Sequence, residues 1–297
     1  MSGQADVNKD KKKDEGKSHP YVGWAITIIT ALLIVMSVRH FCLESYQIST
    51  DAMEEALHKG DYVLVDKLPL KGNPGRNRVV LFTSPLQKDT LDSPLFLSRC
   101  IGMPGDTIRI SGEGYEVNGK QLPHSPRSLN TYFLTQTSAA TFLKALKKLG
   151  IPARDWKGET FGFSLSLTSF EEYQLREELT EEMNIHFIRN QVAPYQLVVP
   201  RKGRAHRLDE AALTACKEAI LAEAGEKAVF RDGKLYLDGR ETTFFFFKQD
   251  YYWMLSDNVN ASVDSRHLGF IPQDHIIGNV WFCWFSHDKQ RIFKPVN

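Results

Sequence analysis

Tyr251 to Pro272 read YYWMLSDNVNASVDSRHLGFIP, and this stretch is the most informative part of the chain. It begins with Tyr251 to Leu255, a run of aromatic and aliphatic residues that predicts a β-strand. The loop that follows is rich in polar side chains: Asp257, Asn258, Asn260, Ser262, Asp264, Ser265 and Arg266. Hydroxyls, carboxylates and a guanidinium at this density favour a mutually hydrogen-bonded network. We therefore predict a strand followed by a structured polar loop.

The overall composition argues against several classes of function. The chain has 297 residues, which is enough for one or two domains, and its formal net charge of +1 gives no general attraction to nucleic acid. The four cysteines, Cys42, Cys100, Cys216 and Cys283, form no CxxC pair. We predict no metal site, no cofactor and no nucleic-acid partner, and the disulfide state stays open. Cys100 and Cys283 stand in apolar strand contexts and are predicted to be buried packing residues.

An uncharged stretch from Tyr21 to Val38 predicts a membrane anchor. Tyr21 and Trp24 lie at one end of it, as is typical of a membrane–water interface. We predict that residues 20–41 cross a lipid bilayer once. A cleaved signal peptide is the alternative, but residues 39–44 offer no small-x-small cleavage site. Residues 1–19 are polar and lysine-rich, which predicts a disordered cytoplasmic tail and places the bulk of the chain on the other side of the membrane.

Beyond the anchor, short strand-like runs alternate with turn signals. Examples are Asp61–Asp66, Arg78–Phe82 and Thr107–Ile110, and Asn118-Gly119 is a strong two-residue hairpin signal. The residues from Ala228 onward again have the composition of short β-strands. This spacing predicts a mainly β fold with an antiparallel sheet or barrel, formed by residues 45–124 and 226–297.

Residues 125–225 have a different pattern and are predicted to form an inserted α+β subdomain. Ser138 to Leu149 has helical spacing and ends before Gly150, a suitable residue just beyond a helix. Ser169-Phe-Glu-Glu172 matches a capping box, and the helix it opens is predicted to reach Met183. A third helix is predicted from Asp209 to Ala224.

Four consecutive phenylalanines, Phe244 to Phe247, stand on a predicted strand. Because side chains alternate along a strand, the four rings cannot all face one core. Two interpretations stay open. Either some rings meet a partner, another domain or a membrane surface, or the whole strand is buried between sheet and insertion.

The chain resembles the type I signal peptidases in several short boxes that occur in the family's order. Gly60–Lys67 is similar to a GDxVLVxK box, and Phe96–Asp106 to a box that ends Gly-x-Pro-Gly-Asp. Ser262–Arg266 and Gly269–Pro272 are similar to the family's SxDSR and Gly-Phe-Val/Ile-Pro signatures. Ile48–Leu57 stands where the family has (P)SxSMxPTL. Ordered boxes after an anchor make a specific match.

The resemblance implies a peptidase in which a serine nucleophile is activated by a lysine base. Aligned on Met53, the nucleophile position is Ala52; aligned on Arg99, the base position is Ser98. An alanine methyl cannot attack a carbonyl, a serine hydroxyl is not a useful base, and a guanidinium does not deprotonate in proteins. The resemblance therefore implies a site from which both reacting groups are missing.

The same resemblance assigns supporting roles to other residues. Thr50 matches a hydroxyl that helps to bind the oxyanion, and Ser262, Asp264 and Arg266 match the loop that braces the site. The family's Gly-Asp-Asn-Arg is replaced by Ser256-Asp-Asn-Val259.

Three hypotheses follow. The favoured one is a non-catalytic signal peptidase relative in the bacterial inner membrane, with its bulk on the periplasmic side, that binds exported preproteins. The second is an active serine endopeptidase with a relocated dyad, for which Lys67 is the nearest candidate base in these boxes. The third is a non-catalytic subunit that pairs with an active signal peptidase, or a chaperone of exported proteins.

Overall fold

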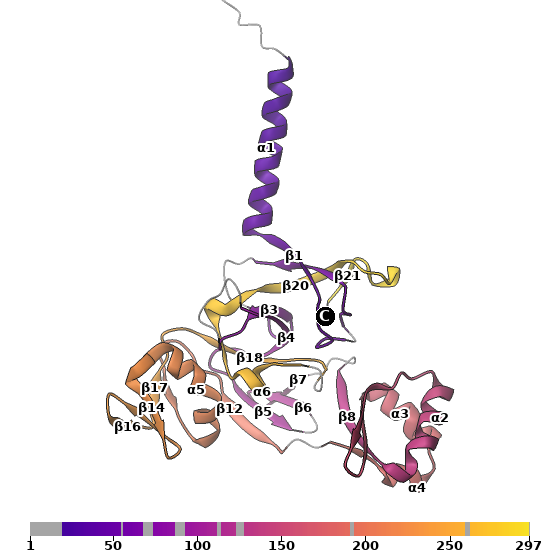
Figure 1. The fold of residues 1–297 in the computed structure, drawn as a ribbon. Helices are drawn as coiled ribbons and strands as arrows, with labels where there is room; N and C mark the ends of the chain where they lie inside the picture. Colours follow the sequence, from indigo (N-terminus) through magenta and orange to yellow (C-terminus); the bar gives the residue numbers. More distant parts are fainter. Residues whose placement is uncertain are drawn as a thin grey trace, which may run out of the picture. The chain divides into compact units, whose positions relative to one another are not determined.

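The computed structural model describes residues 20–54, 56–67, 74–86, 93–111, 114–122, 128–190, 193–258 and 262–296 (Figure 1). The chain divides into two compact units, Met1–Cys42 and Leu43–Asn297. The tail that we predicted to be disordered, residues 1–19, lies outside the described residues.

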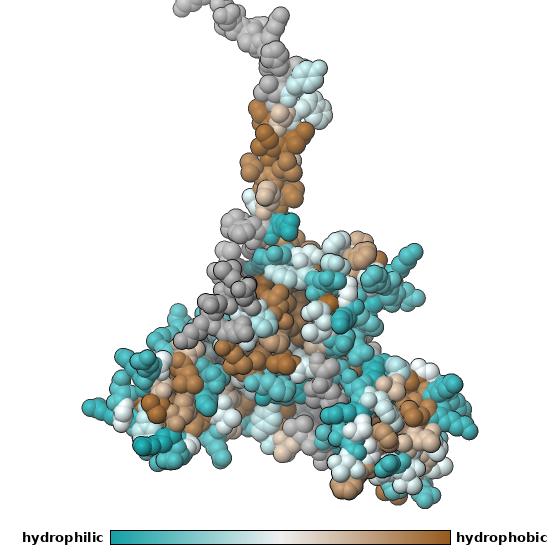
Figure 2. Space-filling model, viewed as in Figure 1, coloured by the Kyte–Doolittle hydropathy of each residue, from teal (hydrophilic) through white to brown (hydrophobic). Residues whose placement is uncertain are grey.

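The first unit contains the helix α1, Pro20–Phe41. A proline fits the first helical position because its missing N–H needs no partner there. The hydroxyls of Thr27, Thr30 and Ser37 donate to carbonyls one turn earlier, at 3.0, 2.8 and 2.7 Å, so they are satisfied within the helix. Hydrophobic side chains cover the middle of the visible face of α1, and paler, less hydrophobic residues lie at its upper end (Figure 2). The helix coincides with the predicted range 20–41.

Among the helices that the structure describes, none has both the length and the apolar composition needed to cross a membrane. The membrane crossing of residues 20–41 stays a prediction.

The second unit is built around one large sheet. Across the sheet, the strands run in the order β1 (Leu43–Gln47), β2 (Tyr62–Asp66), β20 (Ile276–Phe285), β3 (Val79–Thr83), β4 (Leu95–Gly102), β18 (Tyr251–Leu255) and β19 (Ile271–Pro272), and β21 (Lys294–Pro295) pairs with β20. Each pairing is antiparallel.

Both faces of this sheet are covered at its centre. Val79 and Leu81 of β3 pack into one apolar cluster, whereas Val80 and Phe82 pack into another. Because side chains alternate along a strand, the two clusters lie on opposite faces. The whole of β3 is buried as a result. The prediction of a mainly β, antiparallel fold is confirmed.

A second antiparallel sheet joins distant parts of the sequence. Its strands, in order, are β12 (Tyr195–Val198), β5 (Thr107–Ser111), β6 (Gly114–Val117) and β7 (Lys120–Leu122). The turn between β6 and β7 is Asn118-Gly119, with φ of 52° and 77°. Positive φ at both central residues is the geometry of the predicted two-residue hairpin, which is confirmed.

A third sheet carries three helices. The strands are β11 (Phe187–Arg189), β8 (Leu129–Thr135), β10 (Gly162–Thr168) and β9 (Arg154–Glu159), and the helices are α2 (Ala139–Leu149), α3 (Ser169–Glu178) and α4 (Glu181–Ile185). Phe142 and Leu146 of α2 and Leu175 of α3 share a core with Leu134 of β8 and Leu165 of β10.

The helix predictions for this region need two corrections. Gly150 lies just beyond α2 at a φ of 71°, as predicted. The capping box of α3 is formed by Thr168 and Glu171, one residue earlier than predicted. The helix also ends at Glu178 rather than near Met183, because the chain turns extended at Leu179 and α4 begins under a new cap, Thr180.

The remaining elements lie outside these three sheets. They are β13 (Ala205–Arg207), α5 (Glu210–Ala224), β14 (Ala228–Arg231), β15 (Lys234–Leu237), β16 (Arg240–Thr242), β17 (Phe244–Phe246), α6 (Ser265–Leu268) and the 3₁₀ turns η1 (Gln136–Ser138), η2 (Gly225–Lys227), η3 (Gln273–His275) and η4 (Lys289–Arg291). Asp209 caps α5 by accepting from Ala212 N–H at 2.8 Å.

The four phenylalanines alternate. Phe245 and Phe247 are buried, and Phe247 lies edge-on to Tyr251 with ring centroids 5.0 Å apart. Phe244 and Phe246 are exposed. The interpretation that buries the whole strand is therefore wrong.

Residues 125–225 contribute to two cores. The strands β8 to β11 and their helices form one, whereas Leu197 of β12 and Ile220 of α5 pack with Ile108 of β5 and Trp253 of β18. The predicted division into 45–124 with 226–297 and an insertion at 125–225 stays a prediction.

Candidate functional site

The polar loop, residues 256–269, is described by the structure at residues 256–258 and 262–269, and this described part is organised around Asp264. This carboxylate is fully buried. Its Oδ2 accepts from Ser256 N–H at 2.9 Å and from Arg266 Nη2 at 2.7 Å, and its Oδ1 accepts from Arg266 Nε at 2.9 Å. Arg266 Nη2 also donates to Ser262 Oγ at 3.3 Å. The predicted hydrogen-bonded network is present in the described part of the loop, and Asn260, which the prediction also named, lies outside the described residues. The several donors offset the cost of burying the Asp264 carboxylate.

A second ion pair holds the start of the loop to β4. Arg99 donates from Nε and Nη2 to the two carboxylate oxygens of Asp257, at 3.0 and 2.7 Å. Its Nη1 donates to the carbonyl of Asn77 at 2.8 Å. Both side chains of the pair are about 95% buried, with 4% and 5% exposure. A paired, two-pronged guanidinium–carboxylate contact fixes geometry as well as charge.

Ser98 lies beside this pair and is completely buried on β4. Its Oγ is 2.9 Å from the Oγ of Ser256. The antiparallel pairing of β4 with β18, which matches Arg99 with Leu255, brings the two serines together.

Ala52 contacts the same part of the loop through its backbone. Its carbonyl accepts from Asn258 N–H at 2.9 Å, and Met53 Sδ lies 3.4 Å from Asp257 N. Ala52 and Met53 are buried, with exposures of 6% and 1%. Ala52 and Ser98 therefore both adjoin Ser256–Asn258, although they come from distant boxes of the sequence.

Thr50 is placed differently. It is exposed, and its hydroxyl makes no hydrogen bond to another described residue. The structure thus brings five of the six predicted site residues to the polar loop: Ala52, Ser98, Ser262, Asp264 and Arg266.

The sequence pointed to Ser256 and Asp257 but did not predict their partners. Ser256 is the hydroxyl partner of Ser98, and Asp257 is the ionic partner of Arg99. The sequence feature that points to these two residues is the triplet Ser256-Asp257-Asn258, which stands where the family has Gly-Asp-Asn.

Ala52 and Ser98 supply neither an activated nucleophile nor a base by themselves. The methyl group of Ala52 carries no reactive heteroatom, and the Ser98 hydroxyl, whose described side-chain partner is the Ser256 hydroxyl, is not a useful base. Lys67, the nearest candidate base by sequence, is held in an ion pair with Glu44.

A thiol and an imidazole do meet elsewhere in the fold. Cys216 Sγ lies 3.6 Å from His206 Nε2, and both side chains are buried. Burial raises the pKa of the Cys216 thiol and lowers the pKa of the His206 imidazole, so both stay neutral near pH 7. A buried neutral thiol is a poor nucleophile.

Two further cysteines are packing residues. Cys100 and Cys283 are buried, as predicted, and burial raises the pKa of the Cys100 thiol to about 12. All four cysteines are free. In the part of the chain that the structure describes, no cluster of His, Cys, Asp or Glu side chains is placed to hold a metal ion.

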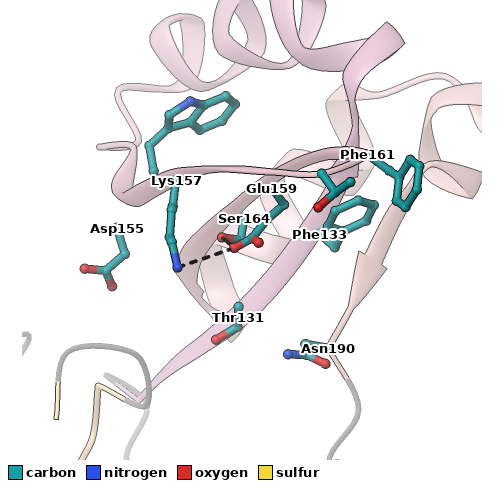
Figure 3. Close-up of a pocket in the computed structure, with 10 residues that line it drawn as sticks. Thr131, Phe133, Asp155, Lys157, Glu159, Phe161, Ser164 and Asn190 are labelled. Atoms are coloured by element: carbon teal, nitrogen blue, oxygen red, sulfur yellow. Dashed lines mark hydrogen bonds and ion pairs between the residues drawn. The ribbon is translucent and has the colours of Figure 1, made fainter.

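A cavity of about 840 Å³ opens on the third sheet, away from these residues (Figure 3). Phe133, Ser164 and Lys157 form a cross-strand row in its lining, and Lys157 Nζ lies 3.9 Å from Glu159 Oε1. None of the predicted site residues lines this cavity. It is therefore separate from the candidate site.

Comparison with known proteins identifies the family. The model of the family described as "Signal peptidase, peptidase S26" matches residues 21–165 and 208–285, which is more than half of the chain. The protein belongs to this signal peptidase family.

The curated relatives carry matching names. Signal peptidase I of Buchnera aphidicola subsp. Baizongia pistaciae is 24% identical over 304 residues, covering 96% of this chain and 83% of the relative. Signal peptidase I of Aquifex aeolicus is 23% identical over 262 residues, covering 88% of this chain and 83% of the relative. Signal peptidase I T of Bacillus subtilis is 27% identical over 131 residues, covering 44% of this chain and 65% of the relative.

Proposed function

We propose that this protein is a non-catalytic member of the signal peptidase family that binds exported preproteins without cleaving them. The observation that carries the proposal is the pair of positions Ala52 and Ser98. The first holds a buried methyl group, and the second holds a hydroxyl whose Oγ is 2.9 Å from another hydroxyl, that of Ser256. Peptide hydrolysis by a nucleophile needs an activated heteroatom and a base within hydrogen-bond reach.

Ser256 supports the proposal independently. The matching position in the family is the glycine of Gly-Asp-Asn, which has no side chain. Here the Ser256 hydroxyl occupies the space next to residue 98 and is itself buried, with 2% exposure. A lysine at position 98 is several atoms longer than serine, and close-packed interiors do not absorb extra atoms without strain. The Ser256 side chain therefore leaves room for serine at position 98 but disfavours the longer lysine there.

The bracing of the loop supports a retained binding surface. The buried pair Arg99–Asp257 and the partly buried pair Arg266–Asp264 hold the loop, which begins at Ser256, next to Ser98 of β4. An extended polypeptide can bind such a surface by adding its backbone to a sheet edge, which needs no nucleophile.

The test compares restored and unrestored proteins in a cleavage assay with a labelled bacterial preprotein. We expect no cleavage by the parent, little by Ala52→Ser/Ser98→Lys, and clear cleavage by Ala52→Ser/Ser98→Lys/Ser256→Gly, in which the lysine has room. The matched control is Ala52→Ser/Ser98→Met/Ser256→Gly, which fills similar space without a base and should be inactive.

The cleavage assay of the unmodified parent protein tests whether the protein is non-catalytic. Cleavage by the purified parent, abolished by Lys67→Met or Cys216→Ala, would replace the proposal with an active enzyme that uses a relocated site. The binding half is decided by co-purification of uncleaved preprotein with the tagged parent. If only an active signal peptidase co-purifies, the protein is a subunit of that enzyme instead.

We also propose that α1 anchors the protein in the bacterial cytoplasmic membrane, with residues 43–297 on the outer side. The support is the uncharged sequence from Tyr21 to Val38 and the exposure of its aliphatic side chains, for example 57% at Leu32 and 60% at Leu33. Arginine near the centre of a spanning helix costs about 2.5–3.5 kcal/mol.

Leu32→Arg/Leu33→Arg is therefore expected to move the protein from the carbonate-resistant membrane pellet to the supernatant. The control Leu143→Arg, at an exposed leucine of α2, should leave it in the pellet. Recovery of the parent in the supernatant would contradict the proposed anchor. Protection of residues 43–297 from protease added on the periplasmic side would show the opposite orientation.

A further inference from the structure

The cavity of about 840 Å³ on the third sheet, which we call the third-sheet cavity, lies outside the candidate site. Its floor is one face of that sheet, where Phe133 of β8, Ser164 of β10 and Lys157 of β9 stand opposite one another in the strand register. Leu134 and Leu165 pack with α2 and α3. Because side chains alternate along a strand, these two leucines lie on the opposite face. The cavity therefore opens on the face of the sheet that does not pack against the helices.

The apolar part of the lining is aromatic and consists of Phe133, Trp156 and Phe161. The Trp156 ring is held in place by stacking on Phe163, with centroids 5.0 Å apart and an interplanar angle of 25°. Phe161 is in the turn between β9 and β10, and its side chain is 80% exposed (Figure 3). A flat apolar ring in water is stabilised when a ligand with a flat apolar face covers it.

The polar part of the lining combines donors and acceptors. It includes the hydroxyls of Thr131, Thr160 and Ser164 and the amide of Asn190, which each donate and accept hydrogen bonds. Thr131 and Ser164 share the sheet face of Phe133, so polar groups and an aromatic ring line the same surface. The ligand that fits this lining has donors, acceptors and an apolar face together.

The charged side chains of the lining largely neutralise one another. Lys157 Nζ lies 3.9 Å from Glu159 Oε1, which also accepts from Ser164 Oγ at 3.1 Å (Figure 3). Asp155 makes no ion pair with another described residue. It has a φ of 52° and stands where the register between β9 and β10 shifts. A β-bulge of this kind redirects side chains, and Asp155 lines the cavity as a hydrogen-bond acceptor.

These features exclude several kinds of ligand. Phosphates and carboxylic acids are repelled by Asp155 and Glu159. A purely apolar ligand would leave the polar lining groups without partners. An extended polypeptide binds by pairing with a free sheet edge, whereas the floor of this cavity includes β8 and β10, which are paired on both sides. A sugar ring meets the requirements, because its hydroxyls donate and accept and its C–H groups form a face that packs on aromatic rings.

We propose that the third-sheet cavity binds a neutral oligosaccharide, with a sugar ring packed on Phe161 and its hydroxyls bonded to Asp155, Thr160 and Asn190. The inference does not depend on the proposed function, because it uses neither Ala52 nor Ser98. Cleavage or binding of a preprotein leaves it unchanged.

The test is isothermal titration calorimetry of the full-length protein, in a detergent without a sugar head group, with maltotriose and tri-N-acetylchitotriose as probes. We expect saturable binding of at least one of the two. Phe161 and Phe170 are both exposed, at 80% and 65%, but only Phe161 lines the cavity. Phe161→Ala should weaken binding about three- to tenfold through loss of the ring contact, whereas Phe170→Ala should bind like the parent.

The acceptor has a matched comparison of its own. Asp155 and Asp232 are both exposed and have φ of 52° and 51°, but only Asp155 lines the cavity. Asparagine tolerates the same backbone conformation. Asp155→Asn should weaken binding about three- to tenfold, because a hydrogen bond to a carboxylate is stronger than one to an amide, and Asp232→Asn should have no effect. Each variant is checked for an unchanged thermal midpoint.

Three results would overturn the proposal. The first is no binding of either probe by the parent. The second is an equal effect of Phe161→Ala and Phe170→Ala, or of Asp155→Asn and Asp232→Asn. The third is displacement of the bound sugar by spermidine in the parent but not in Asp155→Asn, which would assign the cavity to a cation. Trigalacturonate, which is negatively charged, should bind less tightly than maltotriose, and equal binding would contradict the exclusion of anions by Asp155 and Glu159.

Discussion

Asp257→Ala is expected to lower the free energy of unfolding by about 3–5 kcal/mol, the usual cost of removing one partner from a buried ion pair. The Arg99 side chain is only 4% exposed, and both oxygens of Asp257 accept from its guanidinium. Without that carboxylate, a buried charge loses the group that neutralises it. Urea unfolding followed by tryptophan fluorescence measures the change.

Two controls separate the buried charge from the general effect of losing an ion pair. Glu178→Ala removes the partner of Lys148, whose side chain is 67% exposed, and should cost less than about 1 kcal/mol. Arg99→Met/Asp257→Leu removes both charges and should recover much of the loss. An Asp257→Ala effect no larger than that of Glu178→Ala would show that Asp257 does not stabilise the fold.

Asp264→Ala is expected to have an effect of similar size, about 3–5 kcal/mol, for two combined reasons. The Arg266 guanidinium loses its bidentate partner, and the buried Ser256 N–H loses its acceptor. Asp264 also caps α6 by accepting from Arg266 N–H at 3.0 Å. Thermal unfolding measures the global effect, and amide hydrogen exchange at Ser256 measures the local one.

Asp264→Asn serves as the graded control. It keeps one carbonyl acceptor and loses the charge, so its cost should fall between zero and that of Asp264→Ala. Faster exchange at Ser256 with an unchanged midpoint would limit the role of Asp264 to the loop. Unchanged exchange would contradict the hydrogen bond itself.

The features that could be predicted from the sequence depend on residues a few positions apart. Asn118-Gly119 makes its hairpin, Gly150 ends α2, and Asp209 caps α5. Each is decided by local backbone preferences, so the pattern of residues is sufficient.

The start of α3 shows where local pattern stops being sufficient. Thr168 with Glu171 and Ser169 with Glu172 both satisfy a capping box. The choice is made by Arg154 on β9, which donates to both oxygens of Glu171 at 2.9 Å. That contact spans two elements, and the sequence contains no local sign of it.

The candidate site was predictable only in part for the same reason. Family boxes pointed to Ala52, Ser98 and Asp264 by resemblance. They did not reveal that Ser98 and Ser256, which are 158 positions apart, share one hydrogen bond.

The Ser98–Ser256 contact also bears on how such a site can evolve. A descendant that regained lysine at position 98 alone would gain no nucleophile and would crowd Ser256, and one that regained serine at position 52 alone would gain no base. If the protein is non-catalytic, as we propose, the contact makes each single substitution toward a serine–lysine pair neutral or harmful.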